Sequence, residues 1–273
     1  MTQASSPEAR LFVFLGAAVA LSGVWGCASS PTTDEVMRRR SAATAQVPPR
    51  TGEIRTIVID AGHGGKDPGT SHFGLKEKAL VLDMARRLRT LLEGTGLTVV
   101  MTRETDVFIP LSGRAAVANR LNADLFVSIH VNANPHRSIS GIEVYYPRQS
   151  TTVSSHHWPP GMTVSEIGTP STTVNQVLWD LVLRKSRVRS RRLASSMCNA
   201  MRNGLGAPCR GIKPARFVVL REARMPAVLV EVGYVTNRDE ATRLASPDYR
   251  QAAARAMTEG ILSYINQVNA QHI

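Results

Sequence analysis

Four ionisable side chains have the types and positions that a hydrolytic metal site needs. His63, His130 and Glu231 each come at the end of a short apolar run, and Glu77 lies in the first turn of an expected helix. Two histidines and one carboxylate are a common ligand set of catalytic zinc, with one coordination position left for water. Two other interpretations stay open at this point. A glutamate at a helix start also interacts favourably with the helix dipole, and a histidine at a strand end is often only a hydrogen-bonded surface residue.

These residues must be positioned by the elements around them, and from residue 54 onward the chain alternates expected strands and helices. Short β-branched runs predict the strands, and apolar residues at helical spacing predict the helices. This order is typical of an α/β domain with a largely parallel central sheet, in which functional groups gather where strands end. The expected strands are 56–60, 97–102, 125–130, 141–146, 217–220 and 227–232, and the expected helices are 75–92, 111–121, 177–205 and 249–268.

Nucleophilic catalysis by a serine or cysteine has little support. The chain has no Gly-x-Ser-x-Gly elbow, and Cys198 and Cys209 have no evident histidine partner. The loop after His63 also lacks the pattern of a phosphate-binding loop. In an oxidising compartment Cys198 and Cys209 could instead pair as a disulfide, although the sequence does not fix their separation.

The composition narrows the class of protein and of partner. The chain has 273 residues, and 33 Lys+Arg against 21 Asp+Glu give a net charge of +12. This excludes an acidic disordered chain, and three cysteines are too few for a disulfide scaffold. The positive charge indicates a polyanionic partner, which could be nucleic acid, anionic lipid or an anionic wall polymer.

The amino terminus indicates export. Residues 11–25 form an apolar run that is shorter than the ~20 residues of a membrane-spanning helix and is typical of a signal peptide. Cys27 follows at once, and the segment resembles a bacterial lipoprotein signal. We therefore predict a signal peptide at 1–26, a lipid anchor at Cys27 that holds the protein at a membrane, and a flexible tether at 27–53. An ordinary cleaved signal is the alternative. Both predict an exported protein, in the periplasm or as an outer-membrane lipoprotein, with no nucleic-acid partner.

A series of motifs then resembles one enzyme family. The segment 59–69, Ile-Asp-Ala-Gly-His-Gly-Gly-Lys-Asp-Pro-Gly, followed by Glu77-Lys78, resembles the opening of the zinc-dependent N-acetylmuramoyl-L-alanine amidases, which cut peptidoglycan during cell separation. The likeness covers nearly all of 55–266. Its further blocks, in the same order, are 102–106, 111–114 with 118–119, 123–133, 141–146, 210–213, 225–237 and 239–241.

The resemblance implies a fold, a reaction and a site. The fold is a single α/β domain, 54–268, with a mixed six-stranded sheet flanked by helices. One Zn²⁺ per chain is held by His63, Glu77 and His130, and Glu231 is the catalytic carboxylate. The reaction is hydrolysis of the amide between N-acetylmuramic acid and L-alanine in peptidoglycan, for wall remodelling and daughter-cell separation. Zinc lowers the pKa of bound water toward ~7, and Glu231 can pass the water proton to the leaving amine.

Further residues are candidates for supporting roles. Asp60 or Asn132 could orient a ligand histidine through its second ring nitrogen, or could only cap local turns, whereas Asp67 is expected to form a turn. The irregular insert 147–175 lies where some family members carry a helix that blocks the zinc cleft until a protein activator removes it. Its Glu166 could approach the metal, or the insert could be an open loop.

A dense basic run on the expected helix 177–205 allows two interpretations. It is either a solvated helix face, or a surface that attracts the anionic wall or an activator. Its residues are Lys185, Arg187, Arg189, Arg191 and Arg192.

Two other functions would share either the fold or the metal chemistry of such an amidase. A wall-binding lipoprotein would retain the fold without turnover. A zinc peptidase acting on the stem peptide would retain the metal chemistry with a different scissile bond.

Overall fold

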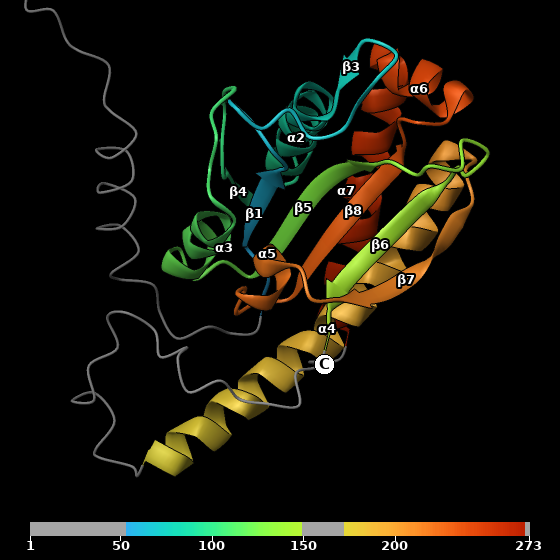
Figure 1. Cartoon of the computed structure of the whole chain (residues 1–273). Coiled ribbons are helices and arrows are strands. Elements are labelled where there is room, and N and C mark those ends of the chain that lie inside the picture. Colours follow the sequence, from blue (N-terminus) through green and yellow to red (C-terminus); the bar gives the residue numbers. More distant parts are fainter. Residues whose placement is uncertain (1–52, 149–171, 271–273) are drawn as a thin grey trace, which may run out of the picture. The chain divides into compact units, whose positions relative to one another are not determined.

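A mixed six-stranded sheet forms the centre of the computed structural model, which describes residues 53–148 and 172–270. The strand order is β4-β1-β5-β8-β6-β7, and all neighbouring pairs are parallel except β8 with β6 (Figure 1). The single domain with a mixed six-stranded sheet is thereby confirmed. The strands are β1 (Thr56–Ala61), β4 (Thr98–Met101), β5 (Leu125–Asn132), β6 (Ile142–Pro147), β7 (Cys209–Ala215) and β8 (Ala227–Tyr234).

The two faces of this sheet are covered unequally. The helices α2 (Glu77–Glu93), α4 (Thr172–Leu205) and α7 (Pro247–Asn269) pack on one face and share the larger hydrophobic core with it. Within the described residues, the other face carries α3 (Leu111–Arg120) and the single turn α5 (Val218–Arg221), with a smaller core. A sixth helix, α6 (Arg238–Ala245), connects β8 to α7.

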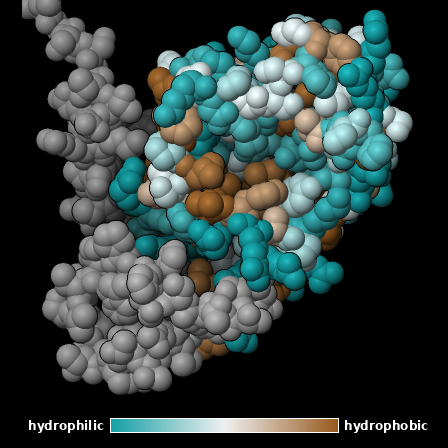
Figure 2. Space-filling view, viewed as in Figure 1, coloured by the Kyte–Doolittle hydropathy of each residue, from teal (hydrophilic) through white to brown (hydrophobic). Residues whose placement is uncertain are grey.

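Alternation along each strand decides which side chain faces which core. In β5, Val127 belongs to the larger core and Phe126 to the smaller one, and in β8 Val230 and Leu229 divide in the same way. His130 and Glu231 have the parity of Phe126 and Leu229, so they face the side of α3 and α5. Figure 2 looks onto this side and shows a group of apolar side chains surrounded by polar ones.

One predicted strand is wrong. Phe217–Leu220 is not a strand, because Val218–Arg221 forms the helical turn α5, which buries Val219 and Leu220 in the smaller core. The sixth strand is β7, whose sequence Cys-Arg-Gly-Ile-Lys-Pro-Ala is too polar to read as a strand. Among the strands of the described residues it is an edge strand paired with β6, so half-exposed polar side chains are tolerated there.

The other predicted strands and helices agree with the structure to within about five residues, whereas the hairpin β2–β3 and the helix α6 were not predicted. A two-stranded hairpin, β2 (Ser71–His72) and β3 (Leu75–Lys76), precedes α2, which therefore begins at Glu77. The insert begins where β6 ends at Pro147, and α4 begins at Thr172, before the predicted residue 177. No helix in residues 53–148 and 172–270 has the length and apolar character that crossing a membrane requires.

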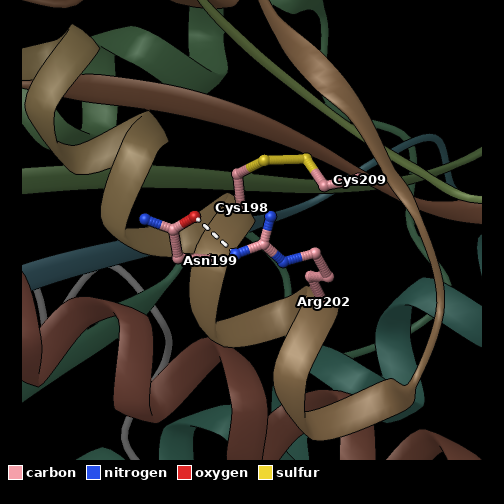
Figure 3. Close-up of a disulfide and its surroundings, with 4 residues drawn as sticks. All are labelled: Cys198, Asn199, Arg202 and Cys209. Carbon is pink, nitrogen blue, oxygen red and sulfur yellow. Dashed lines mark hydrogen bonds between the residues drawn. A yellow bond between two sulfur atoms is a disulfide. The ribbon is translucent and has the colours of Figure 1, made fainter.

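Cys198 of α4 and Cys209 of β7 form a disulfide, so their pairing is confirmed (Figure 3). The bond joins a helix of the larger core to the edge strand of the sheet. Other predictions cannot be compared with the structure. The signal 1–26, Cys27, the tether up to residue 52, and Glu166 with most of its insert lie outside the described residues.

Candidate metal centre and catalytic carboxylate

The structure brings together the three residues that the sequence predicts as metal ligands. One ligand atom from each of His63, Glu77 and His130 lies within 4.8 Å of the others. Nε2 of His63 is 3.1 Å from Oε2 of Glu77, and Nδ1 of His130 is 2.9 Å from Oε1. Two imidazole nitrogens and a carboxylate are a donor set that suits zinc, so the residues fit the ion. Within the described residues, this is the group of histidine, cysteine and acidic side chains that could hold a metal.

Two glycines make room for these side chains. A Cβ on Gly62 would lie 2.3 Å from Cε1 of the His130 ring. A Cβ on Gly69 would lie 2.5 Å from Oε2 of Glu77, and Gly69 also has a φ of +65°. The predicted metal ligands His130 and Glu77 therefore occupy the space that a side chain would need, and only glycine fits at these two positions of the loop.

Two buried arginines hold the backbone of that loop. Arg103 donates hydrogen bonds to the carbonyls of Ala61 (2.8 Å) and Gly62 (2.8 Å). Arg114 donates to the carbonyls of Ala61 (2.8 Å) and His63 (2.7 Å). Buried carbonyls that accept charged donors are held firmly, which fixes the position of His63, a non-glycine residue at φ 59°.

Asp60 has a different role from the predicted one. Its carboxylate accepts hydrogen bonds from Thr102 (2.7 Å), Arg114 (2.9 Å) and Ser128 (2.7 Å), and it is fully buried. These bonds satisfy Asp60 and neutralise Arg114 without contact to a ligand histidine. The prediction that Asp60 orients such a histidine is therefore wrong. Asp60 instead accepts a hydrogen bond from Arg114, which in turn donates to the backbone carbonyl of His63.

Asp67 is the residue that contacts a ligand histidine. Its Oδ2 is 2.8 Å from Nδ1 of His63, and its Oδ1 accepts a hydrogen bond from the backbone N–H of Gly69. Asn132 instead donates to Glu143 (3.3 Å) and accepts from Ala133, so its predicted contact is absent among the described residues. Asp67 forms the expected turn and also holds the ring. The signal in the sequence was a carboxylate four residues after a histidine.

Electrostatics keep Glu77 ionised. Burial on its own would raise the pKa of Glu77, but the hydrogen bonds with His130 and His63 outweigh burial and lower that pKa below its usual value. The backbone N–H groups of Thr70 (2.9 Å) and Val131 (3.0 Å) also donate to its carboxylate. A carboxylate held in the anionic form is the form that binds a cation.

Glu231 lies beside the ligand group on the next strand. It is the Cα partner of His130 in the β5–β8 pair, and partners in a ladder direct their side chains to the same face. Its Oε2 is buried and accepts no hydrogen bond from the described part of the chain. Burial, with the nearby charges of Glu77 and Glu143, raises its pKa well above the ordinary value. A basic carboxylate with an unsatisfied buried oxygen can accept a proton from a bound molecule.

Glu143 extends the same row of side chains, and the sequence analysis did not identify it. It is the Cα partner of Glu231 across β6 and β8 and is almost completely buried. Its carboxylate accepts hydrogen bonds from Lys213 and from the hydroxyl of Tyr145 (2.5 Å), and Arg210 lies 3.9 Å away. A glutamate within a strand predicted to be apolar was the available signal.

Comparison with known proteins places this site in a family. The family profile described as N-acetylmuramoyl-L-alanine amidase matches residues 57–263. N-acetylmuramoyl-L-alanine amidase AmiA of Escherichia coli (strain K12) is 31% identical over 264 residues, which cover 93% of this chain and 90% of AmiA. The chain belongs to the N-acetylmuramoyl-L-alanine amidase family.

Solved structures agree in fold. The amidase AmiC2 of Nostoc punctiforme is 35% identical, with a TM-score of 0.60 over 78% of this chain and 97% of AmiC2. The CwlD amidase of Clostridioides difficile, solved in complex with the GerS lipoprotein, is 25% identical, with a TM-score of 0.63 over 78% of this chain and 99% of that chain.

Proposed function

We propose that this chain is a zinc-dependent amidase that hydrolyses the bond between N-acetylmuramic acid and L-alanine in peptidoglycan. The observation that carries the proposal is one arrangement: His63, Glu77 and His130 converge on one point, and Glu231 stands opposite His130 on the adjacent strand. Family membership supports the substrate, and the donor set supports zinc.

The chain's own residues account for most of the chemistry. Bound zinc would supply Lewis acidity to the amide carbonyl and to the attacking water. Glu231 accepts the water proton on its buried carboxylate and returns it to the amine of L-alanine as the bond breaks. Burial makes this carboxylate basic enough for both transfers. Asp67 holds the His63 ring, and Arg103 and Arg114 hold the loop that carries it.

Product analysis tests this proposal against the two rivals. Purified peptidoglycan is digested with the enzyme, with and without a chelator, and the products are identified by mass spectrometry. We expect stem peptides with a free L-alanine amino end, lost with the chelator and restored by zinc. Cleavage within the peptide would replace the proposal with a peptidase. Absence of any chelator-sensitive product would leave only a wall-binding protein.

The site of action is part of the same proposal. We expect export to the periplasm, with Cys27 as a lipid anchor at the outer membrane and a role in wall remodelling and daughter-cell separation. Fractionation of a Cys27→Ser variant tests the anchor, because the lipidated protein stays with membranes and the variant becomes soluble. Long chains of unseparated cells on deletion of the gene would support the role in separation.

The last part of the proposed function is regulation by a partner protein. The complex of CwlD with GerS is a precedent for an amidase of this fold bound to another protein. We propose that the insert shields the cleft, with Glu166 near the metal, until an activator displaces it. Deletion of residues 150–172 should then raise basal hydrolysis of purified wall. Unchanged hydrolysis would refute the shielding.

A further inference from the structure

The row of side chains beside the metal centre continues past Glu231 to the edge of the sheet. His130 of β5, Glu231 of β8 and Glu143 of β6 are successive Cα partners. Lys213 of β7 pairs with Tyr145, which has the parity of Glu143, so Lys213 faces the same side. The row therefore runs from a predicted metal ligand, through the catalytic carboxylate, to a cation on the edge strand.

Two cations meet one carboxylate at the end of this row. Lys213 donates to Oε1 of Glu143, and Nε of Arg210 lies 3.9 Å from the same oxygen. Burial on its own would raise the pKa of Glu143, but the hydrogen bonds from Lys213, Tyr145 and Tyr234 outweigh it and lower that pKa. Among these three side chains, an ionised Glu143 balances one of the two positive charges, which leaves about one net positive charge.

Both cations remain accessible although Glu143 is buried. The side chains of Arg210 and Lys213 are 42% and 44% exposed, against 4% for Glu143. Lys213 alone would be enough to neutralise Glu143. The second cation, Arg210, lies at the same oxygen and donates one hydrogen bond to the carbonyl of Ser140 (3.3 Å), and as a half-exposed guanidinium it keeps further donors that face solvent.

We propose that Arg210 and Lys213 form a subsite that binds a free carboxylate of the substrate's stem peptide and so selects the peptide that is cut. This inference rests on the proposed amidase function and names the recognition element of the same site. Charge-assisted hydrogen bonds from lysine and arginine to a carboxylate are the strong polar contacts in proteins, which suits a half-exposed recognition site.

Distance along the sheet identifies which carboxylates reach it. Neighbouring strands are ~4.8 Å apart, and the head groups of Arg210 and Lys213 lie at the carboxylate of Glu143 on β6, so they are about one strand spacing from Glu231 on β8. An extended peptide advances ~3.4 Å per residue. A stem that starts with L-alanine at Glu231 and runs across β6 therefore brings its second or third residue to Arg210 and Lys213. The ligand chemistry is a peptide carboxylate, and two positions on the stem can supply it.

Kinetics with matched substrates test the subsite. The substrates are a muramoyl tripeptide with free carboxylates on its second and third residues, and two versions with one of these converted to an amide. For the wild type, we expect kcat/KM to fall ~10-fold with one of the amides, through KM, and this substrate identifies the position. Arg210→Gln and Lys213→Met should bring the ratio of acid to amide toward one.

The variants distinguish a loss of substrate recognition from a structural disturbance around Glu231. Arg210→Gln leaves the contact between Lys213 and Glu143 in place, so the environment of Glu231 is preserved. Arg202→Gln is the charge-matched control, because Arg202 lies on α4, which covers the opposite face, and contacts Asn199 (Figure 3). It should keep the wild-type ratio.

Two results would overturn the subsite. One is a wild type that cleaves acid and amides equally, and the other is an Arg210 variant that loses activity equally on all three substrates. Both differ from a failure of the proposed function, which would appear as no release of peptide from any muramoyl substrate by the wild-type zinc enzyme.

Discussion

Oδ2 of Asp67 lies 2.8 Å from Nδ1 of His63, so the nitrogen of His63 that faces away from Glu77 is held by a carboxylate. This contact leaves Nε2 directed at the ligand group. A carboxylate on the far nitrogen of a ligand histidine fixes the ring and makes it a better donor. The glycine-rich loop thus supplies both a ligand and the group that orients it.

Asp67→Ala should therefore weaken zinc binding by ~10–100-fold, the usual cost of losing such a contact. The measurement is zinc affinity of the purified protein by competition with a chromophoric chelator. Asp248→Asn, an exposed carboxylate on α7, is the control and should bind zinc as the wild type does. Unchanged affinity in Asp67→Ala would show that the contact does not orient His63.

Gly62→Ala should reduce zinc binding without unfolding the domain. The added Cβ would approach the His130 ring to 2.3 Å, and the ring must turn away from Glu77 to avoid it. Gly62 has no positive φ, so the backbone accepts alanine and the effect comes from the clash alone. Zinc titration and circular dichroism together measure it. Gly94→Ala, at the end of α2, is the control.

Glu231→Gln should lower kcat by ~10²–10⁴-fold, the range for loss of a general base. The substitution keeps the shape of the side chain, and zinc content should stay at one per chain because Glu231 is not a ligand. Turnover of muropeptides and metal analysis of the same sample give both quantities. Glu93→Gln, exposed at the end of α2, should turn over normally. A variant that keeps its activity would remove Glu231 from the mechanism.

Replacing Cys198 and Cys209 by serine should lower the free energy of unfolding by about 2–3 kcal/mol, the chain-entropy value for so short a loop. The two residues are 11 apart in sequence. Urea unfolding of the mature protein measures the change. A thiol reductant should destabilise the wild type by a similar amount and leave the double variant unchanged. Equal stability of both proteins in oxidising buffer would contradict the prediction.

The ion pair of Asp83 with Arg250 should make stability depend on acid pH. Burial on its own would raise the pKa of Asp83, but the hydrogen bonds from Arg250 (2.5 Å) and Arg87 outweigh it and lower that pKa. The folded state therefore favours the ionised form, and this stability is present above the unfolded pKa of ~3.9 and is lost as pH falls through the lower folded pKa.

Asp83→Asn measures this contribution. Because Asp83 is about one-third exposed, we expect a loss of only ~0.5–1 kcal/mol at pH 7, shrinking toward zero near pH 3. Urea unfolding at both pH values provides the comparison. A difference that stays the same at pH 3 would mean that packing, and not charge, connects α2 to α7.

The sequence predicts the fold well because strands and helices depend on local patterns, and apolar runs locate β1, β5 and β8. The ligand group was predicted from the resemblance to a known family, because His63, Glu77 and His130 are far apart in the sequence and the fold brings them together. Strand β7 was missed because pairing at an edge, and not hydrophobicity, makes it a strand. Phe217–Leu220 was misassigned because a β-branched run buried by one helical turn has the same composition as a strand.

The supporting residues were harder to predict because their partners are distant in the sequence. Asp60 meets Arg114, 54 residues away, and Glu143 meets Lys213, 70 residues away. Nothing in the chain near Asp60 or Asn132 indicates which polar group each will face. The contact between Asp67 and His63 could have been predicted, because the two residues are only four apart, but a turn accounted for an aspartate at this position equally well.

Along β5 and β8, successive side chains alternate between the larger core and the opposite face of the sheet, which carries His130 and Glu231. Val230 and Val232 fill the core beneath α4 and α7, and Glu231 between them faces the substrate side. A slip of β8 by one residue would put a carboxylate into the apolar core and a valine opposite His130. Insertions or deletions within β8 should thus abolish folding and activity together, so that evolution can vary this strand by substitution but not by length.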